Sequence, residues 1–250
     1  MVGITERGDA SNCYIENLQQ NLFGIKEVFK WEEKLGKVDF AILITKCVTD
    51  DFIEAVLRHK NKVLLHATVT GYGGTIIEPN VFTKEKSHMQ VKKLLSLGFP
   101  AQQIVLRVDP IIPSDKGIEK AKEVLELFSD TGIKRVRYSF LDVYPHVAER
   151  FKAAGIKLPY ETFRAPDAMI SKARAAIHEY DSLYDFESCA EGDVDKVGCI
   201  SEKDYKIMNI PFKIESTSHQ RKGCSCVNKK ELLSECKRCS HQCLYCYWVG

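Results

Sequence analysis

The sequence has no apolar run long enough to span a bilayer and no strong excess of charge. Its 36 basic and 34 acidic side chains leave a formal net charge of +2, so electrostatics alone neither requires nor excludes a nucleic-acid partner. Residues 1–9 lack the apolar core of a signal peptide. No internal repeat or low-complexity run divides the chain. We therefore expect a cytoplasmic protein with no membrane partner.

Cysteine is scarce in the first 180 residues, where only Cys13 and Cys47 occur. The remaining eight of the ten cysteines fall between Cys189 and Cys246. In a reducing compartment, such a cluster favours metal binding over disulfides. Each of the two early cysteines is expected to be a small buried hydrophobe.

Short apolar runs alternate with segments of helical period along most of the chain. The expected strands are residues 2–5, 38–45, 63–70, 104–108, 136–141 and 183–187. Strands that alternate with helices indicate parallel βαβ units and an α/β fold, as one barrel or one open sheet. We expect a body of residues 1–188 and a cysteine-rich tail of residues 189–250.

Three of the expected helices have clear boundaries. Thr83 should open one whose apolar side carries Met89, Val91 and Leu94. Another is expected at 118–129, and a long helical stretch at 161–180 contains Pro166, a residue that breaks or restarts a helix.

Polar side chains follow the expected strands at their carboxyl ends, where α/β proteins bind ligands. They include Asp9, Lys46, Thr70, Arg107, Asp109, Ser139 and Glu191. Arg107 suits a bidentate contact with a carboxylate or phosphate, although it could equally pair with Asp109 and fix a turn. The glycines around Tyr72, in the stretch 71–74, would let the backbone approach a ligand.

The most informative motif is Cys239-x3-Cys243-x2-Cys246, with Tyr245 directly before the last cysteine. A [4Fe–4S] cluster has four irons, so three cysteines leave one iron open to a small molecule. The alternative is a zinc knot in which Cys236 supplies a fourth thiolate, because structural zinc sites are closed by four protein ligands.

The cysteine spacing resembles the signature of the radical SAM superfamily, and more closely a branch whose cluster motif lies at the C-terminus. The stretches that carry this resemblance are 7–9 (Arg-Gly-Asp), 68–73, 78–84, 107–112, 139–144, 188–191, 198–200 and 220–226. The Asp-Pro-Ile-Ile turn at 109–112 is also similar to one in spore photoproduct lyases, radical SAM enzymes that repair a thymine dimer in DNA.

The resemblance implies a partial (β/α)6 TIM-like barrel, with the tail folded over the carboxyl ends of the strands. It further implies a [4Fe–4S] cluster that reductively cleaves S-adenosylmethionine to a 5′-deoxyadenosyl radical, and an electron donor such as flavodoxin or ferredoxin. By the same resemblance, catalytic roles are expected for Arg107, Asp109 and Glu191. Cofactor contacts are expected for Thr70, Tyr72, Ser139, Arg107 and Glu191.

Four further cysteines remain once the C-terminal motif is assigned: Cys189, Cys199, Cys224 and Cys226. They suit a second cluster with four protein ligands, or a structural zinc. Cys236 or His219 could replace one of them.

The tail is also basic, with Arg221, Lys222, Lys229, Lys230, Lys237 and Arg238 opposed by two glutamates. With Tyr247 and Trp248, it could hold a nucleic-acid backbone and stack a base, so a DNA or RNA base is the leading expectation for the substrate. A solvated lysine face is the simpler explanation of these charges. The alternative function is a zinc-stabilised nucleic-acid-binding protein without redox activity.

Overall fold

The computed structural model describes residues 1–6, 8–11, 31–188, 190–192, 194–212, 225–226, 229–233 and 239–248. The predictions for Arg7, Cys13, Cys189, His219, Cys224, Cys236 and the basic residues 221, 222, 237 and 238 fall outside these residues. The described part forms one seven-stranded sheet. Its strands are β1 (Val2–Ile4), β2 (Ala41–Thr45), β3 (Val63–Thr68), β4 (Ile104–Ile111), β5 (Arg135–Phe140), β6 (Asp185–Ser188) and β7 (Lys229–Glu231).

All neighbouring strands are parallel, in the order β6-β5-β4-β3-β2-β1-β7. The six strands expected from the sequence are therefore present, and β1 to β6 follow one another across the sheet without reversal. Because right-handed crossovers that always step in one direction place their helices on one side, this order collects helices α2 to α6 on a single face. The α/β class is confirmed; the sheet is open, with β6 and β7 at its edges, and is not a closed barrel.

Among the helices of the described residues, the three longest lie where the sequence predicts helices. The helices are α2 (Asp50–Arg58), α3 (Lys84–Ser96), α4 (Asp115–Phe128), α5 (Pro145–Ala153), α6 (Asp167–His178) and α7 (Glu202–Ile207), with short 3-10 helices η2 (Trp31–Lys37), η3 (Lys60–Lys62) and η4 (Ala101–Gln103). Thr83 caps α3 as expected by accepting a hydrogen bond from the Lys86 amide. Pro166 lies directly before α6. The helix expected at 161–180 therefore begins only at Asp167.

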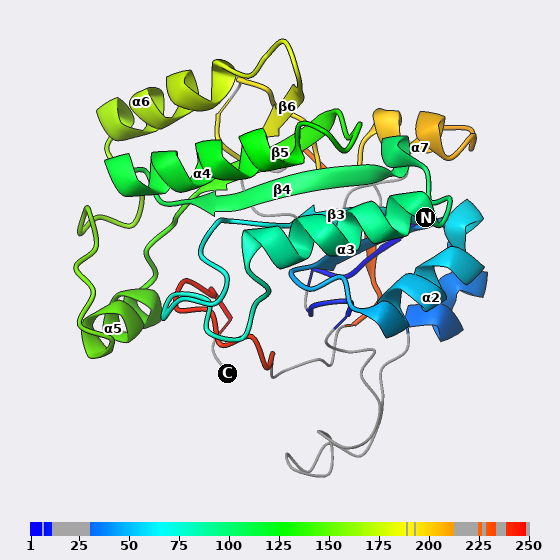
Figure 1. The fold of residues 1–250 in the computed structure, drawn as a ribbon, viewed down its shortest axis with the longest axis horizontal. Coiled ribbons are helices and arrows are strands. Elements are labelled where there is room, and N and C mark those ends of the chain that lie inside the picture. The colour runs from blue at the N-terminus through cyan, green and yellow to red at the C-terminus, as the bar shows by residue number, and fades with distance from the viewer. Residues whose placement is uncertain are drawn as a thin grey trace.

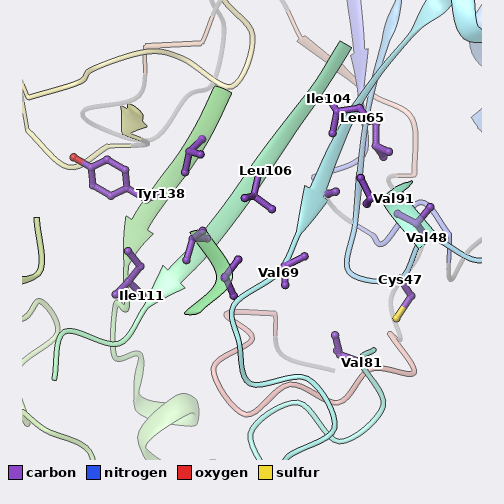
Figure 2. Packing of buried hydrophobic residues seen from close by; sticks show 14 of the residues in the cluster. Cys47, Val48, Leu65, Val69, Val81, Val91, Ile104, Leu106, Ile111 and Tyr138 are labelled. Atoms are coloured by element: carbon purple, nitrogen blue, oxygen red, sulfur yellow. The ribbon is translucent and has the colours of Figure 1, made fainter. Parts of the chain in front are cut away.

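The main hydrophobic core lies between the sheet and helices α2 to α6. Figure 1 shows α2, α3 and α4 in front of the sheet. Alternate residues of each strand face these helices, and Figure 2 shows Leu65 of β3 near Ile104 and Leu106 of β4. Cys47 belongs to this core and is 4% exposed, which confirms its prediction as a buried hydrophobe. Met89, expected on the apolar side of α3, is instead 59% exposed.

The opposite face of the sheet carries a smaller apolar cluster that the sequence did not predict. Tyr205 of α7 packs there against Phe40, with ring centroids 5.2 Å apart. Cys199 and Cys226 belong to the same cluster. Since β7 pairs with β1, segments of the expected tail are part of the body of the molecule.

In the part of the chain that the structure describes, no helix is both long and apolar enough to cross a membrane.

Candidate functional site

The C-terminal segment 239–248 crosses the carboxyl ends of the strands. The Leu244 amide donates a 3.0 Å hydrogen bond to the carbonyl of Ile77, and the Asn80 side chain donates one of 2.7 Å to the carbonyl of Ser240. Figure 1 shows this segment, in red, beside the cyan loop that follows β3. The cysteine motif is thereby held against the loop between β3 and α3.

Arg150 attaches the segment to α5 on its other side. Its guanidinium donates hydrogen bonds of 2.5 Å and 3.0 Å to the carbonyls of Cys246 and Trp248. These contacts fix the backbone at the last cysteine and two residues after it.

Lys46, directly after β2, connects the strand ends to the motif. Its ammonium donates to the Tyr245 hydroxyl at 2.7 Å and pairs with the Glu78 carboxylate at 3.0 Å. The other Glu78 oxygen accepts a 2.7 Å hydrogen bond from Thr70, so Thr70 supports this ion pair. Burial lowers the pKa of Lys46, but Glu78, Cys243 and other nearby acidic groups hold that pKa above its usual range. Lys46 therefore stays charged at the centre of the site.

Asp9 performs the same bridging role after β1. Its carboxylate accepts hydrogen bonds from the Thr45 hydroxyl at 2.8 Å and the Lys46 amide at 2.6 Å. It also forms an ion pair of 3.2 Å with His241, which lies between the first two cysteines of the motif. Two acidic residues, Asp9 and Glu78, thus hold the motif at strand ends that are far away in sequence.

The three cysteines differ in exposure: Cys243 is 7% exposed, Cys246 is half-buried and Cys239 is exposed. Burial raises the pKa of the Cys243 thiol above its usual range, Lys46 opposes this rise, and charge on Cys239 or Cys246 adds to it.

Arg107, Asp109 and Ser139 form a second polar group, at the ends of β4 and β5. Arg107 donates through Nε to Asp109 at 3.1 Å, and the Ser139 hydroxyl donates to the other oxygen of the same carboxylate. Burial raises the pKa of Asp109, but these partners hold it below its usual value, so Asp109 is ionised. Arg107 and Asp109 thus pair with each other, one of the two interpretations that the sequence left open.

Glu191 lies beside this group. One of its oxygens accepts a 3.0 Å hydrogen bond from the Phe140 amide, and the other lies 3.3 Å from Arg164. Burial raises the pKa of Glu191 to about 7, with Asp142 and Asp109 adding to the rise. A carboxyl with this pKa can both donate and accept a proton near neutral pH.

The Tyr72 amide donates a 3.3 Å hydrogen bond to the Thr70 hydroxyl. The Tyr72 ring belongs to the core on the helix side of the sheet and is 5% exposed. The neighbouring Gly73 lies close to the backbone of Phe82, since a Cβ at Gly73 would lie 1.8 Å from the Phe82 carbonyl oxygen. The glycine loop therefore allows two parts of the backbone to meet.

Two cysteines of the second set come together on the face opposite the helices. Sulfur atoms of Cys199 and Cys226 and a carboxylate oxygen of Glu6 lie within 4.8 Å of one another. Cys189 and Cys224, the other members of that set, lie outside the described residues. Glu6 was not expected in this group.

Sequence reasoning also missed a buried ion network on the same face. Glu187, fully buried, accepts hydrogen bonds from Arg135 at 2.9 Å and from Arg137, and Asp204 pairs with Arg135 at 2.9 Å. Among the described residues, Nε and Nη1 of Arg137 and Nε2 of His66 have no hydrogen-bond partner. The alternation of Arg135, Arg137 and Ser139 along β5 was the signal for a polar face.

Comparison with protein families matches residues 14–248 to the family described as Domain of unknown function (DUF1848), so the chain belongs to this family. No curated protein and no solved structure matches the chain.

Proposed function

We propose that this protein is a radical-SAM-like enzyme whose catalytic cluster is held by Cys239, Cys243 and Cys246. The observation that carries the proposal is the position of this C-x3-C-x2-C motif, which Lys46, Asp9 and Arg150 hold at the carboxyl ends of the strands. Parallel α/β sheets bind their ligands at this edge.

The chemistry of the three thiols fits a [4Fe–4S] cluster. Cysteine is the usual ligand of such clusters, and three of them leave one iron for S-adenosylmethionine. Metal ligation requires thiolates, and burial opposes the ionisation of Cys243, so the positive charge of bound iron would favour the ligating form. When bound and reduced, the cluster would supply the electron that cleaves S-adenosylmethionine.

The protein's own groups would bind and orient the cofactor and substrate. The Arg107 guanidinium, held in place by Asp109, offers a positive charge to a carboxylate or phosphate. Glu191 and Ser139 border the same strand ends, and Glu191 could exchange a proton near pH 7. In this proposal Thr70 acts indirectly, through Glu78 and Lys46.

The sequential strand order supports a partial barrel that opens between β6 and β7. In a barrel of this kind the helices lie outside and the face with Arg107, Arg137 and Glu187 lies inside. That face carries the buried Arg137–Glu187 ion pair and also the apolar cluster on which α7 packs.

A nucleic-acid base is the substrate class that we favour. Tyr247 and Trp248 are 50% and 43% exposed, and their ring centroids lie 5.1 Å apart. Exposed aromatic rings beside a cluster motif offer a stacking surface for a base turned out of its strand. Reaction would also require an electron donor such as flavodoxin or ferredoxin.

Anaerobic purification followed by iron and sulfide analysis tests the cluster. The wild-type protein should be brown and contain about four irons in this cluster, while Cys243→Ala should lose them. Cys47→Ala is the matched control, since it removes a buried thiol that belongs to the core. Zinc without iron at the motif, after reconstitution with iron and sulfide, would favour the zinc-stabilised nucleic-acid-binding protein instead.

A further inference from the structure

Glu6, Cys199 and Cys226 form a compact group of metal-ligating side chains away from the C-terminal motif. One ligand atom of each lies within 4.8 Å of the other two. Both cysteines are 2% exposed, whereas the Glu6 side chain is 26% exposed. The group lies beside β1 and β7, on the sheet face opposite helices α2 to α6.

The backbone is shaped to bring the two cysteines together. A Cβ on Gly198 would lie 2.4 Å from the carbonyl oxygen of Ser225, so only glycine allows the two segments to approach this closely. The Cys199 amide donates to the sulfur of Cys226 at 3.0 Å. Such an N–H donor stabilises a thiolate and orients it as a ligand.

Glu6 is fixed by two contacts with β7. Its amide donates a 3.1 Å hydrogen bond to Glu231, and one oxygen of its carboxylate accepts from Lys229. The contact with Lys229 is an outer hydrogen bond of the kind that holds carboxylate ligands in metal sites.

We propose that Glu6, Cys199 and Cys226 bind a single zinc ion, separate from the cluster at the C-terminal motif. Thiolate and carboxylate groups together suit zinc. Tetrahedral ligands at about 2.3 Å from zinc lie about 4 Å apart, which agrees with the observed spacing. The sulfur ligands of a [4Fe–4S] cube lie farther apart, because each is bound to a different iron.

The charges around the group favour this ligand set. Two thiolates and one carboxylate exceed the charge of zinc by one, and Arg107 lies with Nη1 3.8 Å from the sulfur of Cys199. Arg137, fully buried, also interacts with the charge on Cys199. Arg107 and Arg137 therefore place positive charge near the sulfur of Cys199 in addition to pairing with Asp109 and Glu187.

The ion would fasten three separate segments. Glu6 follows β1, Cys226 precedes β7 and Cys199 precedes α7. β7 has only three residues, so its pairing with β1 is short. Metal bonds to Glu6 after β1 and to Cys226 before β7 would stabilise this pairing. The Glu6 side is accessible, so the fourth position of the tetrahedron is open to water, as in zinc sites that have three protein ligands.

Zinc analysis of a variant that lacks the C-terminal motif tests the proposal. Cys239, Cys243 and Cys246 are all changed to Ala, and the protein should retain about one zinc ion per chain. Adding Cys226→Ala should remove this zinc, whereas adding Cys47→Ala should not. Absence of zinc from the first variant, or its retention after Cys226→Ala, would overturn the proposal.

X-ray absorption at the zinc edge identifies the ligands. We expect two sulfur and two oxygen ligands in the parent variant, and weaker zinc binding in Glu6→Gln; four sulfur ligands would contradict the role of Glu6. Zinc and iron are also counted separately in the wild-type protein, so the result does not depend on whether the variants fold. Iron without zinc contradicts this inference alone, and zinc without iron contradicts the proposed function alone.

Discussion

The ammonium of Lys46 lies 2.7 Å from the hydroxyl of Tyr245, although 199 positions separate the two residues. Lys46 directly follows β2, and Tyr245 stands between the last two cysteines of the motif. This contact, with the Glu78 carboxylate behind it, joins the sheet to the candidate cluster site.

Lys46→Met should destabilise the protein by about 3 kcal/mol or more, because it leaves the buried Glu78 carboxylate without its cation. Urea unfolding followed by circular dichroism measures this change. Lys122→Met is the matched control: its partner Glu179 is 60% exposed, so water replaces the lost contact and stability should change little. Equal effects of the two substitutions would show that Lys46 has no special structural role.

Glu191 should make the free energy of unfolding depend on pH. Its pKa is about 7 in the folded protein against an ordinary value of 4.5, so the folded state binds the proton more tightly than the unfolded state. Stability should therefore fall by about 3 kcal/mol as the pH rises from about 4.5 to about 7. Urea unfolding at several pH values in this range measures how the free energy of unfolding changes with pH.

Glu191→Gln should remove the contribution of Glu191 to the pH dependence of the free energy of unfolding, because an amide does not titrate. Glu179→Gln, a change on the exposed surface of the protein, should leave it in place. An unchanged slope in Glu191→Gln would mean that the carboxyl is already ionised in the folded protein.

Gly73→Ala should destabilise the protein by about 3 kcal/mol, because its Cβ would meet the Phe82 carbonyl at 1.8 Å and the backbone would have to move. Gly36→Ala is the control, since a Cβ there meets nothing within 4 Å and its effect should stay within about 1 kcal/mol. Thermal unfolding compares the two. A tolerated Gly73→Ala would show that the loop can open at this point.

Hydrophobic periodicity was sufficient for the α/β class and for six strands, because β2, β3 and β4 are rich in apolar residues and each is followed by a helix, while β5 alternates apolar with polar residues. It missed β7, whose sequence Lys-Lys-Glu has no apolar pattern and which forms only because β1 offers an unpaired edge. It also could not choose between a barrel and an open sheet, since that choice depends on the contacts of the edge strands.

The candidate site was predicted in part. Polar residues at strand ends identified Arg107, Asp109 and Ser139, which the structure brings together. The pairing of Lys46 with Tyr245 depends on the path of the tail, which no local pattern encodes. The ring of Tyr72 packs in the core, and the neighbouring Gly73 lies against the Phe82 backbone.

The most direct measurement is the release of 5′-deoxyadenosine from S-adenosylmethionine by anaerobically purified protein with dithionite as reductant. The wild-type protein and Cys47→Ala should release it, and Cys243→Ala should not, because the proposed cluster loses a ligand. Intact S-adenosylmethionine after incubation with iron-loaded wild-type protein would contradict the proposed radical chemistry.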